Sequence, residues 1–237
     1  MIRSSFFLLF ISLSFFDCSE TESPNSTEKI FWIWTSRIPC EFDTTLRCLY
    51  ILNENTLDYN RDNWVRLDEN YVLVGFDYES GYFYQLKVEV PEVSDVNPFD
   101  YKVLEIIQKV KDYTPDINAG WDIIQINSSK VPEEKFDYFG INFEDWRRII
   151  TANTDCNYYY GNIGKVGESE FSVFSLSSEY VDENTECDDF GLKDAILSSK
   201  SYYLINNDSL ILKDQNQEIT LILKRLPGYN PYGPKRP

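Results

Sequence analysis

The chain has 237 residues, of which 43% are hydrophobic and 16% aromatic, enough for one large domain or two smaller ones. The net charge of −17 argues against nucleic-acid binding, which needs a basic face, and against docking on an anionic membrane. No histidine is present, which removes Ser-His-Asp and Cys-His nucleophile systems and histidine-based zinc sites.

The start of the chain predicts export. A short basic segment at 1–3 precedes an apolar run at 6–16 that is too short to span a bilayer as a stable anchor. This order is typical of a secretory signal peptide. We therefore expect a signal peptide over residues 1–17.

The end of that segment resembles a bacterial lipobox, in which the cysteine becomes the lipidated first residue of the mature chain. The cysteine here is Cys18, although Asp17 stands where a lipobox has a small residue. We expect lipidation of Cys18 and a polar, flexible tether over 18–29. Ordinary cleavage nearby is the alternative.

Cysteine usage fits an exported chain. If Cys18 carries lipid, four cysteines remain, and two disulfides are expected in an oxidising compartment. Pairing Cys40 with Cys48 and Cys156 with Cys187 keeps each bridge within one predicted module. A four-cysteine zinc site is the alternative, but the spacing lacks the close pairs that such sites have.

The first half predicts strands. Aromatic and β-branched runs are at 30–34, 48–52, 71–76 and 82–90. In the last run, apolar residues alternate with mostly polar ones, which predicts one buried and one wet face. A turn at 77–81 precedes it and contains Gly81, where a positive φ is tolerated.

This block resembles a small bacterial domain of unknown function that often precedes META domains. The residues that carry the resemblance are Cys40, Cys48-Leu49, Trp64 and the motif Gly75-Phe76-Asp77-Tyr78-Glu79-x-Gly81-Tyr82-x-Tyr84-x-Leu86-x-Val88. The resemblance implies a β-rich module over 30–113 and no known activity.

Residues 101–113 leave two interpretations open. Val103, Ile106, Ile107 and Val110 fit a helix face, with Asp100 as a possible N-cap. The family resemblance implies a long strand instead, and we favour the strand.

One stretch matches ligand positions of a calcium loop. The positions are Asp58, Asn60, Asp62 and Glu69, but Asn63 replaces the glycine that the sharp turn needs. The flanking segments also look like strands and not paired helices. We expect a polar hairpin loop, with calcium binding as the alternative.

The second half follows a linker at 114–120 and predicts further strands and one helix. The strands are expected at 121–126, 138–143, 147–152, 170–176, 202–205, 210–212 and 219–224. A helix is expected at 189–199, capped by Asp188 or Asp189. Residues 154–161 are interpreted as a strand end that runs into a tight turn.

The second half also resembles the META domain of HslJ-like heat-shock lipoproteins. The carrying residues are Trp121 and Ile126, Cys156-Asn157 and Gly161, Thr185 ahead of Cys187, the helix 190–197 and the ending Tyr202-x-x-Ile205-x-Asn207-Asp208-x-Leu210-x-Leu212. Asp155 departs from the family, which has glycine there. The resemblance implies a compact β fold with one helix over 114–226, in an envelope protein linked to stress, followed by a disordered tail at 227–237.

Two clusters of side chains, one of carboxylates and one of tyrosines, could each have either a functional or a purely structural role. Carboxylates crowd the approach to Cys187 (Asp182, Glu183, Glu186, Asp188 and Asp189), and these could hold a metal, although a solvated loop is expected. Tyr158, Tyr159 and Tyr160 could stack on a sugar or a partner, but alternation would bury some of them in the core.

The sequence thus predicts a mainly β (α+β) protein of two β-rich modules. We expect a non-enzymatic outer-membrane lipoprotein without a cofactor, anchored through its lipid and binding an unknown envelope protein or glycan. The alternative is an inhibitor of a hydrolase such as lysozyme or a protease. A carboxylate-dependent glycan hydrolase is a third hypothesis.

Overall fold

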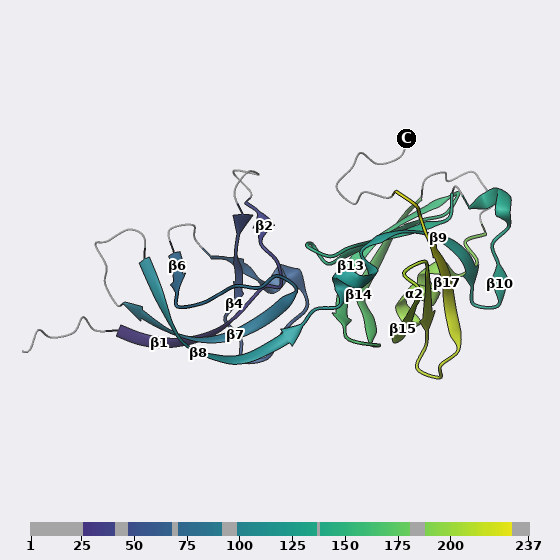
Figure 1. Cartoon of the computed structure of the whole chain (residues 1–237). Coiled ribbons are helices and arrows are strands. Elements are labelled where there is room, and N and C mark those ends of the chain that lie inside the picture. Colours follow the sequence, from purple (N-terminus) through teal and green to yellow (C-terminus); the bar gives the residue numbers. More distant parts are fainter. Residues whose placement is uncertain are drawn as a thin grey trace, which may run out of the picture.

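The computed structural model describes residues 26–40, 47–67, 71–91, 99–136, 138–180 and 188–228. Two curled sheets account for most of these residues, and the described part of the chain has two α-helices (Figure 1). The prediction of a mainly β, α+β fold is therefore confirmed. We call the residues of β1–β8 the first module and those of β9–β17 the second module.

The first module is built on a six-stranded sheet in the order β5-β4-β1-β7-β8-β6. Its strands are β1 (Ser26–Ile33), β4 (Tyr50–Leu52), β5 (Val65–Arg66), β6 (Tyr71–Val74), β7 (Tyr82–Pro91) and β8 (Phe99–Lys111). Neighbours are antiparallel except for β6, which runs parallel to β8. A separate pair, β2 (Ile38–Pro39) and β3 (Arg47–Cys48), lies beside it, and the 3₁₀ turn η1 (Arg61–Asn63) precedes β5.

Both faces of this sheet are buried near its centre. Successive strand residues point to opposite faces, so Trp32 and Trp34 enter one apolar cluster while Phe31 and Ile33 enter another. On β7, Tyr84, Leu86, Val88 and Val90 are buried, as the alternation predicted, but Phe83 is buried on the opposite face as well. The face predicted to be wet is thus half covered.

Residues 101–113 form a strand as far as Lys111, because β8 pairs along its length with β7. Two register shifts, beside Leu86 and Val88, insert extra residues into β8. A bulge places Val103 and Ile106, three residues apart, opposite Val88 and Leu86 on one face of the sheet. Val110 pairs with Phe83 and packs on the other face, so the helix-like spacing does not correspond to a single face. The helix interpretation is therefore wrong. At the other end, β1 begins at Ser26, so 26–29 lie in a strand and not in the predicted tether.

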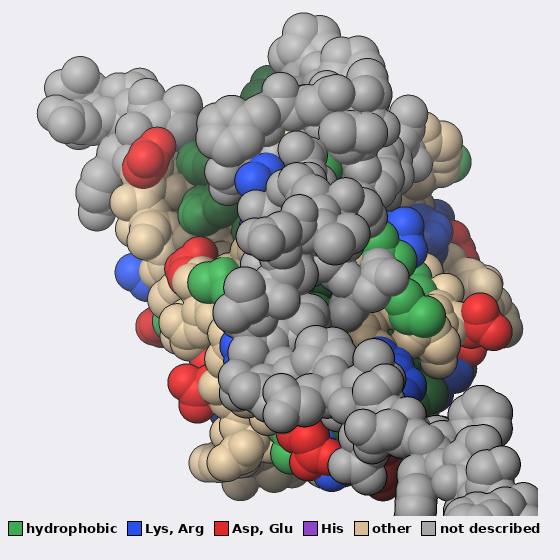
Figure 2. Space-filling model, turned by 90° about the vertical axis from the view of Figure 1, so that its left-hand side faces the viewer, with side chains coloured by type: hydrophobic (Ala, Val, Ile, Leu, Met, Phe, Trp, Pro, Cys, Tyr) green, Lys and Arg blue, Asp and Glu red, His purple; other side chains and the backbone are tan. Residues whose placement is uncertain are grey.

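Exposed aliphatic residues lie on the first module, where Figure 2 shows hydrophobic side chains interspersed with charged ones. They are Ile30, Val65, Val72, Val74, Leu104, Ile106 and Ile107. Two ion pairs join β7 to its neighbours on this module: Lys87 with Glu28 of β1 at 2.8 Å, and Glu89 with Lys102 of β8 at 3.3 Å. Charged and apolar side chains are therefore mixed on the exposed surface of these strands.

The second module has a nine-stranded sheet in the order β14-β13-β12-β11-β9-β17-β16-β15, with β10 also paired to β9. Its strands are β9 (Ala119–Ile126), β10 (Ser129–Lys130), β11 (Gly140–Glu144), β12 (Ile149–Asn153), β13 (Asn157–Val166), β14 (Phe171–Tyr180), β15 (Ser201–Ile205), β16 (Ser209–Lys213) and β17 (Ile219–Arg225). The helical turns are α1 (Thr114–Ile117), η2 (Glu133–Lys135) and α2 (Leu192–Ser198).

The second sheet curls until its two edge strands meet. The Phe171 N–H donates to the Lys200 carbonyl at 2.9 Å, and the Tyr202 N–H donates to the Ser169 carbonyl at 3.0 Å. Helix α2 packs one face against this sheet, since Leu192, Ala195 and Ile196 are buried in the module's core while Asp194 and Ser198 are exposed. The result is a nearly closed barrel with one helix packed against its core.

The predicted helix begins later than expected. Gly191, in the left-handed region with φ of 72°, is its N-cap. Asp188 and Asp189 act just before it, where their carboxylates accept the N–H groups of Phe190 and Gly191, each at 2.9 Å. They shape the turn that leads into the helix and are not its caps, contrary to the prediction.

The stretch 154–161 also differs from its prediction. The turn comes first, where the Thr154 hydroxyl accepts the Asn157 N–H at 3.0 Å. Asn157 then opens β13, a ten-residue strand, and Gly161 lies in its middle. The glycine is needed because β14 lies so close: a Cβ there would be 2.0 Å from the Ser175 carbonyl oxygen.

We expect Gly161→Ala to lower the free energy of unfolding by about 1–3 kcal/mol, because the backbone of β14 has to move away. Urea denaturation would measure this. Gly140→Ala on β11 is the matched control, because its nearest neighbour is the Asn153 side chain at 3.2 Å. Equal stability of the two variants would contradict the close approach.

Candidate functional site

The hairpin turn between β11 and β12 joins the second module to the first. The Arg148 N–H donates to the Asp145 carbonyl at 3.2 Å, and the Asp145 carboxylate accepts the Trp146 N–H at 2.7 Å. Arg148 has a left-handed φ of 54°, a conformation that L-residues adopt at a cost. Trp146 packs against the first module's apolar cluster, so the turn contributes to both modules.

Arg148 is fully buried at this junction. Its Nη1 donates to Asp112 Oδ1 and to Thr114 Oγ1, each at 2.8 Å, and its Nη2 donates to the Gly164 carbonyl. The guanidinium carbon also lies 5.3 Å from the centre of the Tyr59 ring, within cation–π distance. One side chain thus contacts the first module, the connecting segment and the second module.

Asp112 receives hydrogen bonds from both sides of the same junction. Its Oδ1 accepts the Thr114 N–H at 3.0 Å and the Thr114 hydroxyl at 2.7 Å. Its own N–H donates to the Gly81 carbonyl at 2.8 Å, and the Gly81 N–H donates to the Thr35 carbonyl at 2.8 Å. The Arg148–Asp112 pair is therefore held by the backbone of the first module and by the turn of the second.

Burial raises the pKa of two side chains near the Arg148–Asp112 pair. The pKa of Asp145 is raised, chiefly by burial and additionally by the nearby charge of Asp112. The pKa of Tyr59 is raised by burial as well, although the positive charges of Lys165 and Arg148 counteract the rise. Tyr59 belongs to the first module, and Arg148, whose guanidinium carbon lies 5.3 Å from the centre of its ring, belongs to the second, so the modules pack closely here.

An open cleft of about 470 Å³ lies beside this junction, with residues of both modules on its walls. We call it the inter-module cleft. The first module contributes Ile38, Cys40, Tyr50, Arg61 and Asp62. The Arg61 guanidinium lies 3.7 Å from the centre of the Tyr50 ring, and its Nη1 donates to the Trp64 carbonyl at 3.3 Å.

The second module contributes Trp146, Arg147, Ile149, Tyr160 and Asn162. The Arg147 guanidinium lies 4.2 Å from the centre of the Trp146 ring, while its Nε is 3.5 Å from a Glu144 oxygen. Tyr160 is 47% exposed. Tyr160 and Asn162 are two residues apart on β13, so they share one face of the strand. Each wall thus pairs an arginine with an aromatic ring.

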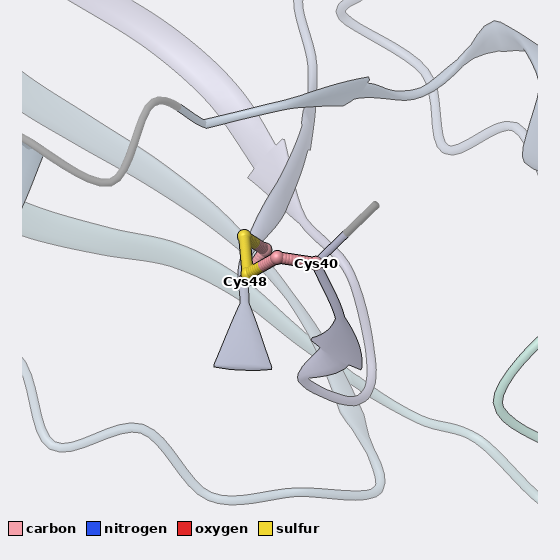
Figure 3. The surroundings of a disulfide bond; sticks show 2 residues. All are labelled: Cys40 and Cys48. Atoms are coloured by element: carbon pink, nitrogen blue, oxygen red, sulfur yellow. A yellow bond between two sulfur atoms is a disulfide. The ribbon is translucent and has the colours of Figure 1, made fainter. Parts of the chain in front are cut away.

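The first predicted disulfide is present in this wall. Cys40, directly after β2, and Cys48, the last residue of β3, are joined, with their Cα atoms 5.3 Å apart (Figure 3). Cys156 is also disulfide-bonded. Its predicted partner Cys187 lies outside the described residues, as does Cys18, so the second pairing and the lipidation stay predictions.

The calcium-loop residues use their oxygens locally. Asp58 accepts the Asn60 N–H at 2.8 Å and the Asn63 side-chain amide, and Asn60 accepts the Asp62 N–H at 3.2 Å. These contacts form the polar loop that the sequence favoured. Glu69 lies outside the described residues, and no group of three or more potential metal ligands gathers among the residues that are described.

The acidic cluster falls largely outside the described residues, which omit Asp182, Glu183 and Glu186. Asp189 accepts a hydrogen bond from the Tyr159 hydroxyl. Tyr159 is 1% exposed in the core, whereas Tyr160 faces the inter-module cleft. The tyrosine run therefore contributes to both the core and the cleft.

Sequence reasoning missed the arginines of this region. Arg147 and Arg148 were assigned to a strand, but both belong to the turn before β12. A signal was present, because the Trp146-Arg147-Arg148 run is conspicuous in a chain with a net charge of −17. Nothing local, however, indicates that Asp112 would lie next to Arg148.

Comparisons with protein-family models, with curated proteins and with solved structures found no match for this chain. The resemblance to META domains therefore stays a prediction. No helix in the described part of the chain has the length and apolar character needed to cross a membrane.

Replacing Arg148 by Met should lower the free energy of unfolding by about 3–5 kcal/mol, because Asp112 is left buried without its cation. Arg147→Met is the matched control, since that side chain is 56% exposed and its ion pair contributes at most about 1 kcal/mol. Adding Asp112→Asn to Arg148→Met should recover part of the loss. Urea denaturation that found similar costs for Arg148→Met and Arg147→Met would contradict the role of the pair.

The raised pKa of Asp145 leads us to expect that the stability of the protein depends on pH. Its raised pKa means that the folded state holds this proton more tightly than the unfolded chain, so this carboxyl lowers stability as the pH rises through the raised value. Asp145→Asn lacks this titration. Its stability relative to the wild type should increase in denaturation experiments as the pH rises above about 4, the ordinary pKa of an aspartate in the unfolded chain. A difference that does not change with pH would refute the assignment.

Proposed function

We propose that the chain is a non-enzymatic cell-envelope lipoprotein that holds a ligand in the cleft between its two β modules. The observation that carries the proposal is the composition of the inter-module cleft. Two arginine–aromatic stacks face it, together with the half-exposed ring of Tyr160. Concave surfaces with aromatic walls and a few polar groups are the usual form of binding sites.

The chemistry of the described walls favours binding over catalysis. Among the described residues that line the inter-module cleft, Asp62 is the one carboxylate. Glycoside hydrolysis by the usual mechanism needs two carboxylates that flank the scissile bond. The chain also lacks histidine, the most common general base.

The envelope location rests on two supports. The Cys40–Cys48 disulfide fits an exported protein, because such bonds persist in oxidising compartments. The signal-like start and Cys18 add a lipid anchor to the proposal, and the resemblance to META domains adds a link to envelope stress.

A thermal-shift panel tests the function with calcium, muropeptides, fatty acids and a basic lysozyme. A ligand at a hundredfold excess over its Kd should stabilise the folded protein by about 2.7 kcal/mol. Tyr160→Ala should abolish the shift. Tyr203→Ala is the matched control, because Tyr203 is 46% exposed on β15 and does not line the cleft.

The panel also separates the alternatives. A shift that survives Tyr160→Ala would contradict binding in the inter-module cleft. If that surviving shift came from lysozyme alone, it would favour the alternative function of hydrolase inhibitor.

A further inference from the structure

We infer that the ligand of the inter-module cleft is a saccharide that carries a carboxylate. This inference deepens the proposed function and rests on it. The evidence is the pairing of stacked arginines with an exposed ring and polar groups around one cavity.

The exposed ring is suited to a sugar. A pyranose presents a face of C–H groups that can lie on the electron-rich face of an aromatic ring. Tyr160 is half exposed on a strand face, and Trp146 lies on the same wall of the cleft. The cavity volume of about 470 Å³ is within the range of small-molecule sites.

The polar groups match the hydroxyl rim of a sugar. Asn162 offers an amide that both donates and accepts hydrogen bonds, and Asp62 offers an acceptor from the opposite module. An apolar peptide segment would leave these groups without partners. The two aliphatic side chains, Ile38 and Ile149, give little surface for such a segment.

The arginines indicate the charge of the ligand. Arg61 and Arg147 place two positive charges in the cleft lining, and Asp62 is the one carboxylate among the described lining residues. Glu144 is not a lining residue, but one of its oxygens lies 3.5 Å from the Arg147 Nε and offsets part of this positive charge. The guanidinium of Arg147 belongs to a side chain that is 56% exposed, and its stacking on Trp146 orients it. An oriented guanidinium can bind a carboxylate through two parallel hydrogen bonds.

The probes are two acidic disaccharides and their methyl esters, titrated into the full-length protein by calorimetry. One contains N-acetylmuramic acid and the other glucuronic acid, so the two arms distinguish the source of the carboxylate. We expect at least one acid to bind about tenfold more tightly than its ester, the effect of one charge-assisted contact.

Two variants assign the contacts. Arg147→Gln should reduce the affinity for the acid about tenfold, to the level of its ester, and leave the affinity for the ester unchanged. Lys130→Gln is the matched control, because it removes the same charge from an exposed position on β10 outside the cleft. Tyr160→Ala should weaken the binding of acid and ester alike.

The outcomes separate this inference from the proposed function. Equal affinities for acid and ester, both lost in Tyr160→Ala, would overturn the carboxylate and retain the cleft as a binding site. No binding of any disaccharide, with a Tyr160-dependent shift from another ligand in the panel, would overturn the saccharide. No binding of the disaccharides together with no Tyr160-dependent shift would contradict both proposals.

Discussion

The arrangement of the two modules depends on one buried ion pair. Arg148 and Asp112 are both shielded from water, with side-chain exposures of 0% and 1%. Such a pair is costly to desolvate, and either partner alone would be a buried uncompensated charge. The modules therefore cannot separate without exposing both charges or leaving them unpaired. The pair favours one docking geometry over a flexible link, even if it adds little net stability.

That geometry creates the inter-module cleft. The turn that presents Arg148 to Asp112 also presents Trp146 and Arg147, the neighbouring residues, to the cleft. Tyr59, which lies against Arg148, and Arg61, which lines the cleft, belong to the same loop of the first module. The contacts that hold the modules and the groups that face a ligand are thus neighbours in sequence on each side. A change at the junction would reposition both walls.

The sequence predicts the strands well because their signal is local. Alternation on β7 and the hairpin of β15 and β16 can be recognised within a few residues. The turn before β12 could not be recognised in this way, because its residue with a left-handed φ is an arginine, where glycine or asparagine is typical. Contacts with distant residues, 36 positions away in the case of Asp112, hold Arg148 in that conformation. No pattern in one sequence reports such a contact.

Gly161 is a second position that the local sequence did not predict correctly. A glycine after a run of tyrosines is typical of a turn, but here it allows two strands to approach closely. The two uses of glycine, a positive φ and the absence of a Cβ, leave the same letter in the sequence. The two uses can be told apart only when the strand next to the glycine is known, and which strand lies there depends on the tertiary structure. The candidate site was hidden for a related reason, since its walls come from segments more than eighty residues apart along the chain, as Arg61 and Trp146 are.

The overall charge and the local charge of the cleft act at different ranges. A net charge of −17 repels large polyanions at distances up to the screening length, about 8 Å at physiological ionic strength. The stacked arginines act at contact distance, where a single carboxylate can form directed hydrogen bonds. A small acid therefore meets weak repulsion and strong contacts, whereas a polyanion meets repulsion along its whole length. For the proposed saccharide ligand, this combination favours a short acidic molecule, or the exposed end of a chain, over an extended polyanion.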